Sequence, residues 1–135
     1  MRAVLDTNVV ISALLNPTGA PARVVRAWTA GVFEYVASEL LLAEVERAFA
    51  YSKIRTRIPP DDASRFVDLM RANCEIMADR PLEVAFACPD PRDEFLISLA
   101  HHARAFIVTG DGDLLSLTPG LPVVSPTAFL EIIGE

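Results

Sequence analysis

Residues 4–15 read VLDTNVVISALL and place a carboxylate, Asp6, between an apolar run and a helical pattern. The run RAVLD, residues 2–6, is mostly aliphatic and predicts a short strand that ends at Asp6. The residues that follow carry apolar side chains at helical spacing, with Asn8 and Ser12 one turn apart, and they predict a helix. A strand that gives way to a helix at a charged residue is the starting unit of an α/β fold.

The same alternation continues to the end of the chain. Pro21 and Gly31 bracket one predicted helix, because proline suits a first turn and glycine a helix end, and Ser38 is placed to cap the next helix. Further strands are expected over residues 33–37, 74–77, 104–109 and 122–124. Further helices are expected over residues 21–30, 39–50, 61–73, 90–103 and 125–133, with a short helix within 111–117 and looser structure over 51–60 and 80–89.

This order of elements predicts the architecture. Strands that alternate with helices form a mostly parallel sheet with helices on both faces, a three-layer α/β/α sandwich. The chain has 135 residues, 52% of them hydrophobic, so residues 1–135 suit a single domain with a substantial core. Ligands of such sheets bind at the carboxyl ends of the strands, and we expect the functional residues there.

Composition narrows the classes of function. The net charge of −6 means that the protein as a whole repels phosphate backbones, so any contact with nucleic acid must be local. Cys74 and Cys88 have no CxxC or paired histidine beside them, which favours reduced core thiols over zinc. No secretion leader or proline-free membrane span is apparent, and we expect a cytoplasmic protein.

Carboxylates fall at predicted strand ends and on predicted helices. Asp6 ends the first strand and Asp111 follows the fourth by two residues, so both share one rim of the sheet. Asp93 lies in the first turn of its helix and leans toward the apolar face. Glu44 and Glu46 share one helix, and each has apolar neighbours at helical spacing. Periodicity alone does not choose between these two glutamates.

If the acids converge, they need a counter-charge. Two carboxylates about 4 Å apart repel by about 4 kcal/mol at an effective dielectric of about 20, and a divalent cation is the simplest partner. Oxygen ligands without histidine or cysteine favour Mg²⁺ or Mn²⁺, which commonly bind substrate phosphates directly. The acidic set therefore favours phosphodiester hydrolysis.

The acids of the second half of the chain also have a structural explanation. Asp90 before Pro91 is a good helix cap, and Asp93 then completes a pattern like a capping box. Asp111 and Asp113 stand beside glycines and could serve as turn residues. Local chemistry alone therefore accounts for these positions without a site.

Other polar residues have structural alternatives as well. Asn8 could cap the first helix, and Ser12 could be a packed hydroxyl one turn later. His101 and His102 lie near the end of their helix, where positive charge is favoured, which suits a structural or solvated role. Taken singly, none of these residues requires a function.

Four segments in this order resemble the PIN domain family. They are LDTNVVISALL at 5–15, SELLLAEVERAF at 38–49, DPRDEFLISLAHHARA at 90–105 and FIVTGDGDLL at 106–115. The resemblance covers nearly the whole chain and is nearest to the small single-domain PIN proteins that are toxins of toxin-antitoxin pairs, the VapC-type toxins. It implies a metal-dependent ribonuclease on the α/β fold predicted above.

The resemblance implies roles position by position. It implies that the catalytic and metal-binding acids are Asp6, Glu44, Asp93 and Asp111, and so it selects Glu44 over Glu46. It implies that further polar side chains orient ligands or hold metal-bound water, namely Asn8, Ser12, Thr109 and Asp113, with Asp90 at a helix entry. The implied cofactor is Mg²⁺ or Mn²⁺, and the implied product ends are a 5′-phosphate and a 3′-hydroxyl.

The resemblance also implies partners. The substrate would be RNA, a cognate antitoxin protein would block the acidic site, and a second copy of the chain would form a homodimer. No membrane partner is implied.

An acidic protein that holds RNA needs a local basic surface. Residues 47–57 contain four cations and no acid, namely Arg47, Lys53, Arg55 and Arg57, together with the aromatic residues Phe49 and Tyr51. Cations that bind phosphates and rings that stack on bases are what single-stranded nucleic acid requires. The alternative is a solvated helix face with its aromatics in the core.

Two other classes of function remain as alternatives. A Mg²⁺-dependent phosphatase of the haloacid dehalogenase type would use a DxD motif, which Asp6-Thr7-Asn8 lacks. A receiver domain would need a lysine late in the chain, and Lys53 is the only lysine present. A non-catalytic interaction module predicts no metal-dependent cleavage of nucleic acid.

Overall fold

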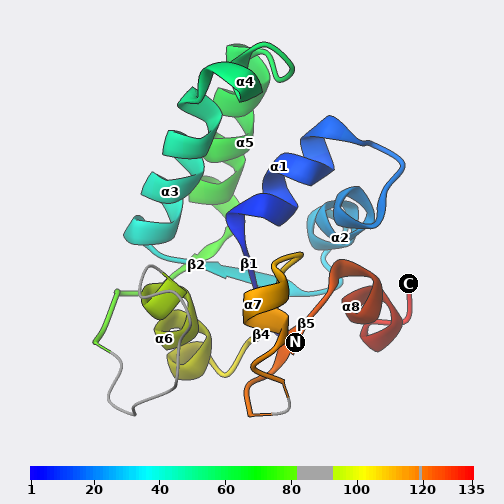
Figure 1. Cartoon of the computed structure of the whole chain (residues 1–135), viewed down its shortest axis with the longest axis vertical. Coiled ribbons are helices and arrows are strands. Elements are labelled where there is room, and N and C mark those ends of the chain that lie inside the picture. The colour runs from blue at the N-terminus through cyan, green and yellow to red at the C-terminus, as the bar shows by residue number, and fades with distance from the viewer. Residues whose placement is uncertain (82–92, 119) are drawn as a thin grey trace.

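A five-stranded sheet forms the centre of the protein (Figure 1). The computed structural model describes residues 1–81, 93–118 and 120–135. The strands are β1 (Arg2–Leu5), β2 (Glu34–Ala37), β3 (Glu75–Ile76), β4 (Phe106–Val108) and β5 (Val123–Val124), in the order β3-β2-β1-β4-β5. Each neighbouring pair runs parallel, so the expected mostly parallel sheet is parallel in every described pairing.

Eight helices connect and cover these strands within the described residues. They are α1 (Thr7–Leu15), α2 (Ala20–Thr29), α3 (Glu39–Ala50), α4 (Ser52–Arg55), α5 (Pro60–Asn73), α6 (Glu94–Ala103), α7 (Gly112–Leu115) and α8 (Pro126–Ile132). The expected looser segment 51–60 contains the short helix α4. Residues 90–92 of the expected helix 90–103 lie outside the described residues, as does most of segment 80–89.

Local signals begin and end the helices as the sequence predicts. Pro21 lies in the first turn of α2, and Gly31 beyond that helix has a φ of +80°, a left-handed conformation that glycine adopts readily. Ser38 caps α3 by accepting a hydrogen bond at Oγ from the Leu41 amide, at 3.3 Å. Ser125 caps α8 in the same manner, accepting from an amide of the first turn at 3.1 Å.

The helices form a layer on each face of the sheet. α6 contacts β1, β2 and β4 and lies below β2 in the view of Figure 1, whereas α1, α2, α3 and α5 lie above it. In the upper layer α1 packs on α2 and α3, and α3 packs on α5, while α2 also contacts α8. This arrangement confirms the predicted three-layer α/β/α sandwich.

Two further expectations concern the cysteines and the membrane. Cys74 is a free, half-buried thiol, and burial raises its pKa to about 12. Cys88 lies outside the described residues. Among the helices that the structure describes, none is both long enough and apolar enough to cross a bilayer.

The register of the sheet brings the ends of β1 and β4 to one level. Leu5 pairs with Val108, and the backbone amide of Asp6 donates to the Val108 carbonyl at 2.9 Å. Asp6 and Thr109, the residues that follow the two strands, therefore leave the sheet side by side at its carboxyl edge. This edge is where the sequence places the functional residues.

Candidate active site

Asp6 is the most enclosed acid at the carboxyl edge of the sheet, with a relative exposure of 9%. It is the N-cap residue of α1, and its Oδ1 accepts a hydrogen bond from the Thr7 amide at 2.8 Å. Its Oδ2 accepts from the Thr109 hydroxyl at 2.8 Å and from the Asn8 side-chain amide at 3.2 Å. These donors fix the carboxylate in one orientation.

Glu44 reaches the same edge from α3. The Thr7 hydroxyl donates to Oε2 of Glu44 at 2.9 Å, which joins the start of α1 to the middle of α3. Glu46 is exposed and instead pairs with Arg71 of α5 at 3.0 Å. Tertiary packing thus turns Glu44 toward Asp6 and Glu46 away from it, a choice that helical periodicity left open.

Asp111 lies at the same edge of the sheet, at the N-cap of α7. Its Oδ1 accepts from the Asp113 amide at 2.9 Å, and its own amide donates to the Thr109 hydroxyl at 2.9 Å. The Thr109 hydroxyl therefore bridges the two residues, because it donates to the Asp6 carboxylate and accepts from the Asp111 backbone amide. The predicted turn role of Asp111 is real, and it coexists with a position beside the other acids.

Asn8 completes the frame around Asp6. Besides donating to Asp6, its side-chain oxygen accepts from the Gly110 amide at 3.2 Å, so it connects α1 to the loop after β4. Ser12 and Asp113 are exposed, and the side chain of neither hydrogen-bonds to a residue in the described part of the chain. The structure thus places Asn8 and Thr109 in contact with Asp6, whereas Ser12 and Asp113 are exposed and show no such contact within the described residues.

The electrostatics of the edge follow from this crowding. Burial raises the pKa of Asp6, the nearby charges of Glu44 and Asp111 raise it further, and hydrogen bonds from Thr109 and Thr7 oppose the rise. No described Lys or Arg is among the groups that shift it. Three carboxylates therefore interact at one rim, and within the described residues no cation offsets the charge of Asp6.

Asp93 occupies the N-cap position of α6, half-buried and with helical backbone angles. Its side chain makes no capping bond. The Asp90 part of the predicted capping pattern lies outside the described residues. α6 packs on β1 and β4, the strands that deliver the other acids, so the membership of Asp93 in the cluster stays a prediction.

The donor atoms of the acidic cluster are of the type that binds a hard cation. Its donors are carboxylate oxygens, and the pKa of Asp6 is raised mainly by burial and further by the charges of Glu44 and Asp111, a repulsion that a divalent ion would relieve. Across residues 1–81, 93–118 and 120–135, however, no three His, Cys, Asp or Glu side chains are positioned to hold one metal ion. The acids are near enough to repel one another and not gathered around one point.

Sequence reasoning missed Thr7. Its hydroxyl is the donor that holds Glu44, and its side chain is buried at the first position of α1. The only signal in the sequence is a hydroxyl placed directly after Asp6, which helix capping would equally explain. The contact spans 37 positions in the chain and becomes visible only once α1 and α3 are packed.

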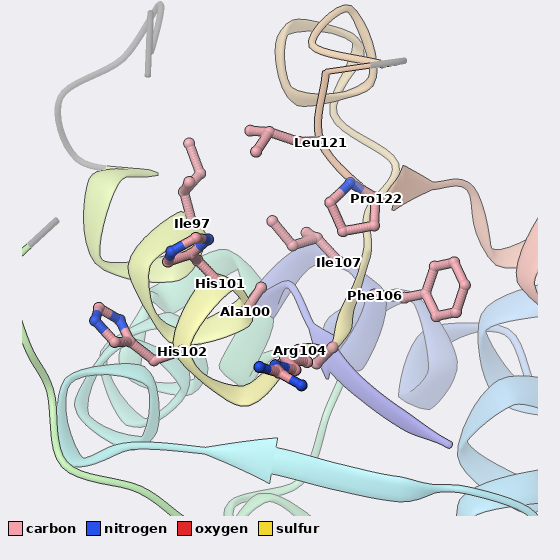
Figure 2. A pocket seen from close by; sticks show the side chains of 10 residues that line it. Ile97, Ala100, His101, His102, Arg104, Phe106, Ile107, Leu121 and Pro122 are labelled. Carbon is pink, nitrogen blue, oxygen red and sulfur yellow. The ribbon is translucent and has the colours of Figure 1, made fainter. Parts of the chain in front are cut away.

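A pocket of about 620 Å³ lies elsewhere, between α6, the start of β4 and the loop before β5 (Figure 2). Figure 2 shows Ile97 and His101 of α6 facing Leu121 and Pro122 across it. Its described lining contains no acid, and the strands that border it begin there and end at the acidic rim. It is therefore separate from the carboxylate edge.

Comparison of sequences identifies similar proteins. The family model described as PIN domain matches residues 2–113. The uncharacterized protein MJ1680 of Methanocaldococcus jannaschii is 30% identical over 118 residues, which cover 87% of this chain and 75% of that protein. The match to the family model includes Asp6, Glu44, Thr109 and Asp111.

Solved structures share the fold over nearly the whole chain. PAE2754 from Pyrobaculum aerophilum has a TM-score of 0.64 at 18% identity, covering 99% of this chain and 90% of that one. VapBC2 from Rickettsia felis, bound to a DNA fragment from its promoter, has a TM-score of 0.63 at 17% identity, covering 93% and 98%. VapBC-1 from nontypeable Haemophilus influenzae has a TM-score of 0.60 at 17% identity, covering 94% and 99%. At these identities the likeness is one of fold.

Proposed function

This chain belongs to the PIN domain family, and from that premise we propose that it is a metal-dependent endoribonuclease. The observation that carries the proposal is that Glu44 and Asp111 lie near enough to Asp6, at the carboxyl edge of β1 and β4, for their charges to act on it, with no described cation offsetting Asp6. Acidic oxygen donors at such an edge suit a divalent ion and a phosphate substrate. The reaction proposed is hydrolysis of a phosphodiester bond in RNA.

Asp6, Glu44, Asp93 and Asp111 would hold Mg²⁺ or Mn²⁺. When bound, the ion would neutralise charge on the scissile phosphate and lower the pKa of an attacking water. Thr109 orients Asp6 and Asp111 relative to each other, and Thr7 orients Glu44. Preorganised ligands of this kind lose less entropy when a metal binds.

The same proposal extends to partners. The solved VapBC structures of Rickettsia felis and Haemophilus influenzae share the fold, which supports a role as the toxin of a toxin-antitoxin pair. A cognate antitoxin would then cover the acidic edge, and the toxin would form a homodimer. An antitoxin that binds there would inhibit cleavage in proportion to its occupancy.

The position of Lys53 argues against the receiver-domain alternative. A receiver needs a lysine at the phosphorylation site, and Lys53 is the only lysine of the chain. Lys53 is exposed on α4, which Figure 1 places at the end of α3 farthest from the sheet and from α7. No other lysine can serve the acids.

The test is cleavage of single-stranded and structured RNAs by the purified protein with Mg²⁺, Mn²⁺ or EDTA. Asp6→Asn and Asp111→Asn are expected to lower metal-dependent cleavage by at least about a hundredfold, because each removes a ligand charge. Asp68→Asn is the matched control, since Asp68 is an exposed acid of α5 and is expected to leave cleavage unchanged.

Far-UV circular dichroism establishes that each variant is folded. Undiminished metal-dependent cleavage by folded Asp6→Asn would contradict the assignment of the site. Absence of cleavage by the unaltered protein on every RNA, with either metal, would contradict the proposed activity itself and favour the non-catalytic alternative.

A further inference from the structure

The far end of α3 carries four exposed cations within one short segment, and none of them forms an ion pair in the described part of the chain. Elsewhere in that part, Arg23, Arg26, Arg80 and Arg104 also form none. In the described residues, Arg2 pairs with Glu34 and Glu75, and Arg65 and Arg71 also pair with acids. The described structure shows no ion pair for the cations of residues 47–57, all of them exposed, namely Arg47, Lys53, Arg55 and Arg57. Outside this segment the chain has eight Lys and Arg against 18 acids, a net charge of −10.

These cations continue the line of α3 away from the acids. Arg47 lies three residues beyond Glu44, on the helix face that presents Glu44 to Thr7. Tyr51 ends α3 and is seven residues from Glu44, a distance of roughly 10 Å along a helix axis. α4 follows directly, and Figure 1 shows it at the tip of α3 and α5.

The two aromatics of the segment divide between core and surface. Phe49 has a relative exposure of 7% and packs edge-on against Phe66 at a centroid distance of 6.4 Å. The expectation that Phe49 offers a stacking surface is therefore wrong. Tyr51 is 70% exposed and presents its ring to solvent beside the unpaired cations.

We propose that Arg47, Tyr51, Lys53, Arg55 and Arg57, here named the α4 patch, bind the strand of RNA whose scissile bond lies at the acidic edge. The inference rests on the proposed ribonuclease function and names how its substrate is held. The cations contact the sugar-phosphate backbone, and the Tyr51 ring stacks on a base.

The distribution of charge explains why RNA would bind at the α4 patch. The acidic edge repels phosphate in the absence of metal, so a strand needs cations elsewhere on the surface that are not already neutralised. The acid next to the patch in the chain is Glu46, which pairs with Arg71 at 3.0 Å. On the other side the first acids are Asp61 and Asp62 at the start of α5, and Asp62 pairs with Arg65 at 3.4 Å. An exposed ring among unpaired cations fits a single-stranded nucleic acid better than an acidic protein segment, which has no need of the ring.

The test is direct RNA binding, measured by fluorescence anisotropy in EDTA, where the proposed metal-dependent cleavage is off. The probe is a labelled single-stranded RNA of mixed sequence, about 20 nucleotides long and so longer than a typical binding site of about 4 to 16 nucleotides. Lys53→Glu/Arg55→Glu is compared with Arg23→Glu/Arg26→Glu, which makes the same change of net charge on exposed residues of α2.

We expect Lys53→Glu/Arg55→Glu to raise the Kd about tenfold or more and to reduce the slope of log Kd against log salt by about 1.4, or 0.7 for each lost contact. The control is expected to show at most a small rise in Kd and an unchanged slope. Tyr51→Ala is expected to raise the Kd about tenfold, while Tyr51→Phe, which keeps the ring, binds as the unaltered protein does.

Equal Kd and equal salt dependence for the patch variant and its control would overturn the inference. The same conclusion would follow if the unaltered protein failed to bind the probe, and the unpaired cations would then fit an acidic protein partner. The cleavage assay above is independent of this binding assay. If the protein binds RNA through another surface, it would still cleave RNA, but the Kd of the patch variant would match that of its control.

Discussion

At the scale of single residues, three side chains hold the acids in place. Thr109 bridges Asp6 and Asp111, Asn8 links Asp6 to the loop after β4, and Thr7 holds Glu44, all through hydrogen bonds of 2.8 to 3.2 Å. Each hydrogen bond to a charged group contributes about 1.5–3 kcal/mol. The bonds that end on the carboxylates of Asp6 and Glu44 fix these oxygens in definite directions before any ligand binds.

Thr7→Val tests the positioning of Glu44. Valine keeps the shape of threonine but cannot donate to Oε2 of Glu44, so metal affinity is expected to fall about 10- to 100-fold. Thr7→Ser keeps the hydroxyl and is expected to bind metal as the unaltered protein does. Isothermal titration calorimetry with Mg²⁺ or Mn²⁺ measures both.

The two variants separate positioning from packing. A change in Tm without a change in metal Kd would show that Thr7 only packs the start of α1. Equal metal affinity in folded Thr7→Val and the unaltered protein would contradict the role given to it.

At the scale of elements, the capping residues decide where helices begin, and the helices decide where acids stand. Ser38 is fully buried and caps α3, the helix that carries Glu44. Ser125 caps α8, which carries no candidate site residue. A comparison of the two caps therefore separates the contribution of a cap to protein stability from any effect on the acidic site.

Ser38→Ala and Ser125→Ala are each expected to lower the free energy of unfolding by about 1–2 kcal/mol, since an amide at the helix start loses its partner. Urea denaturation measures the loss. Cleavage below the unfolding transition is expected to be unchanged in Ser125→Ala. A loss within about 0.3 kcal/mol of zero for both variants would contradict the capping assignments.

Sequence periodicity predicted most elements but not α4. The helices from α1 to α3 are each at least nine residues long and have apolar residues at helical spacing, so local pattern identifies them. α4 has four residues, fewer than two turns, and too few to show a period. Its existence depends on the connection between α3 and α5 rather than on its own sequence.

At the scale of the whole molecule, the parallel sheet concentrates negative charge at one edge. β1 lies beside β4, so acids that are far apart in the chain meet at their carboxyl ends. Their repulsion opposes folding in the absence of a cation. Metal binding to the folded state is therefore expected to stabilise the protein as a whole.

Saturating Mg²⁺ is expected to raise the Tm in differential scanning fluorimetry. At a concentration 100 times the Kd the stabilisation is about 2.7 kcal/mol, or roughly 10 °C for a domain of this size. Asp6→Asn is expected to lose nearly all of this shift, while Asp68→Asn retains it. KCl at matched ionic strength is the control, and an equal shift in Asp6→Asn would contradict metal binding at this edge.

The sequence by itself determined the alternation of strands and helices, the caps of α3 and α8, and the positions of Asp6 and Asp111 just beyond strands. These features depend on residues close together in the chain, whose hydrophobic period and hydrogen-bonding side chains act before any tertiary contact forms. The resemblance to a family added Glu44 and Asp93 as expectations.

Only the tertiary structure decided which groups meet. The strand order, the contact of Glu44 with Thr7, the pairing of Glu46 with Arg71 and the burial of Phe49 all depend on packing between distant elements. The hydrogen bonds that define the acidic edge span 37 and 103 positions in the chain. Local periodicity places a side chain on a helix face or at a strand end, but its partner depends on how the layers pack, which local sequence does not specify.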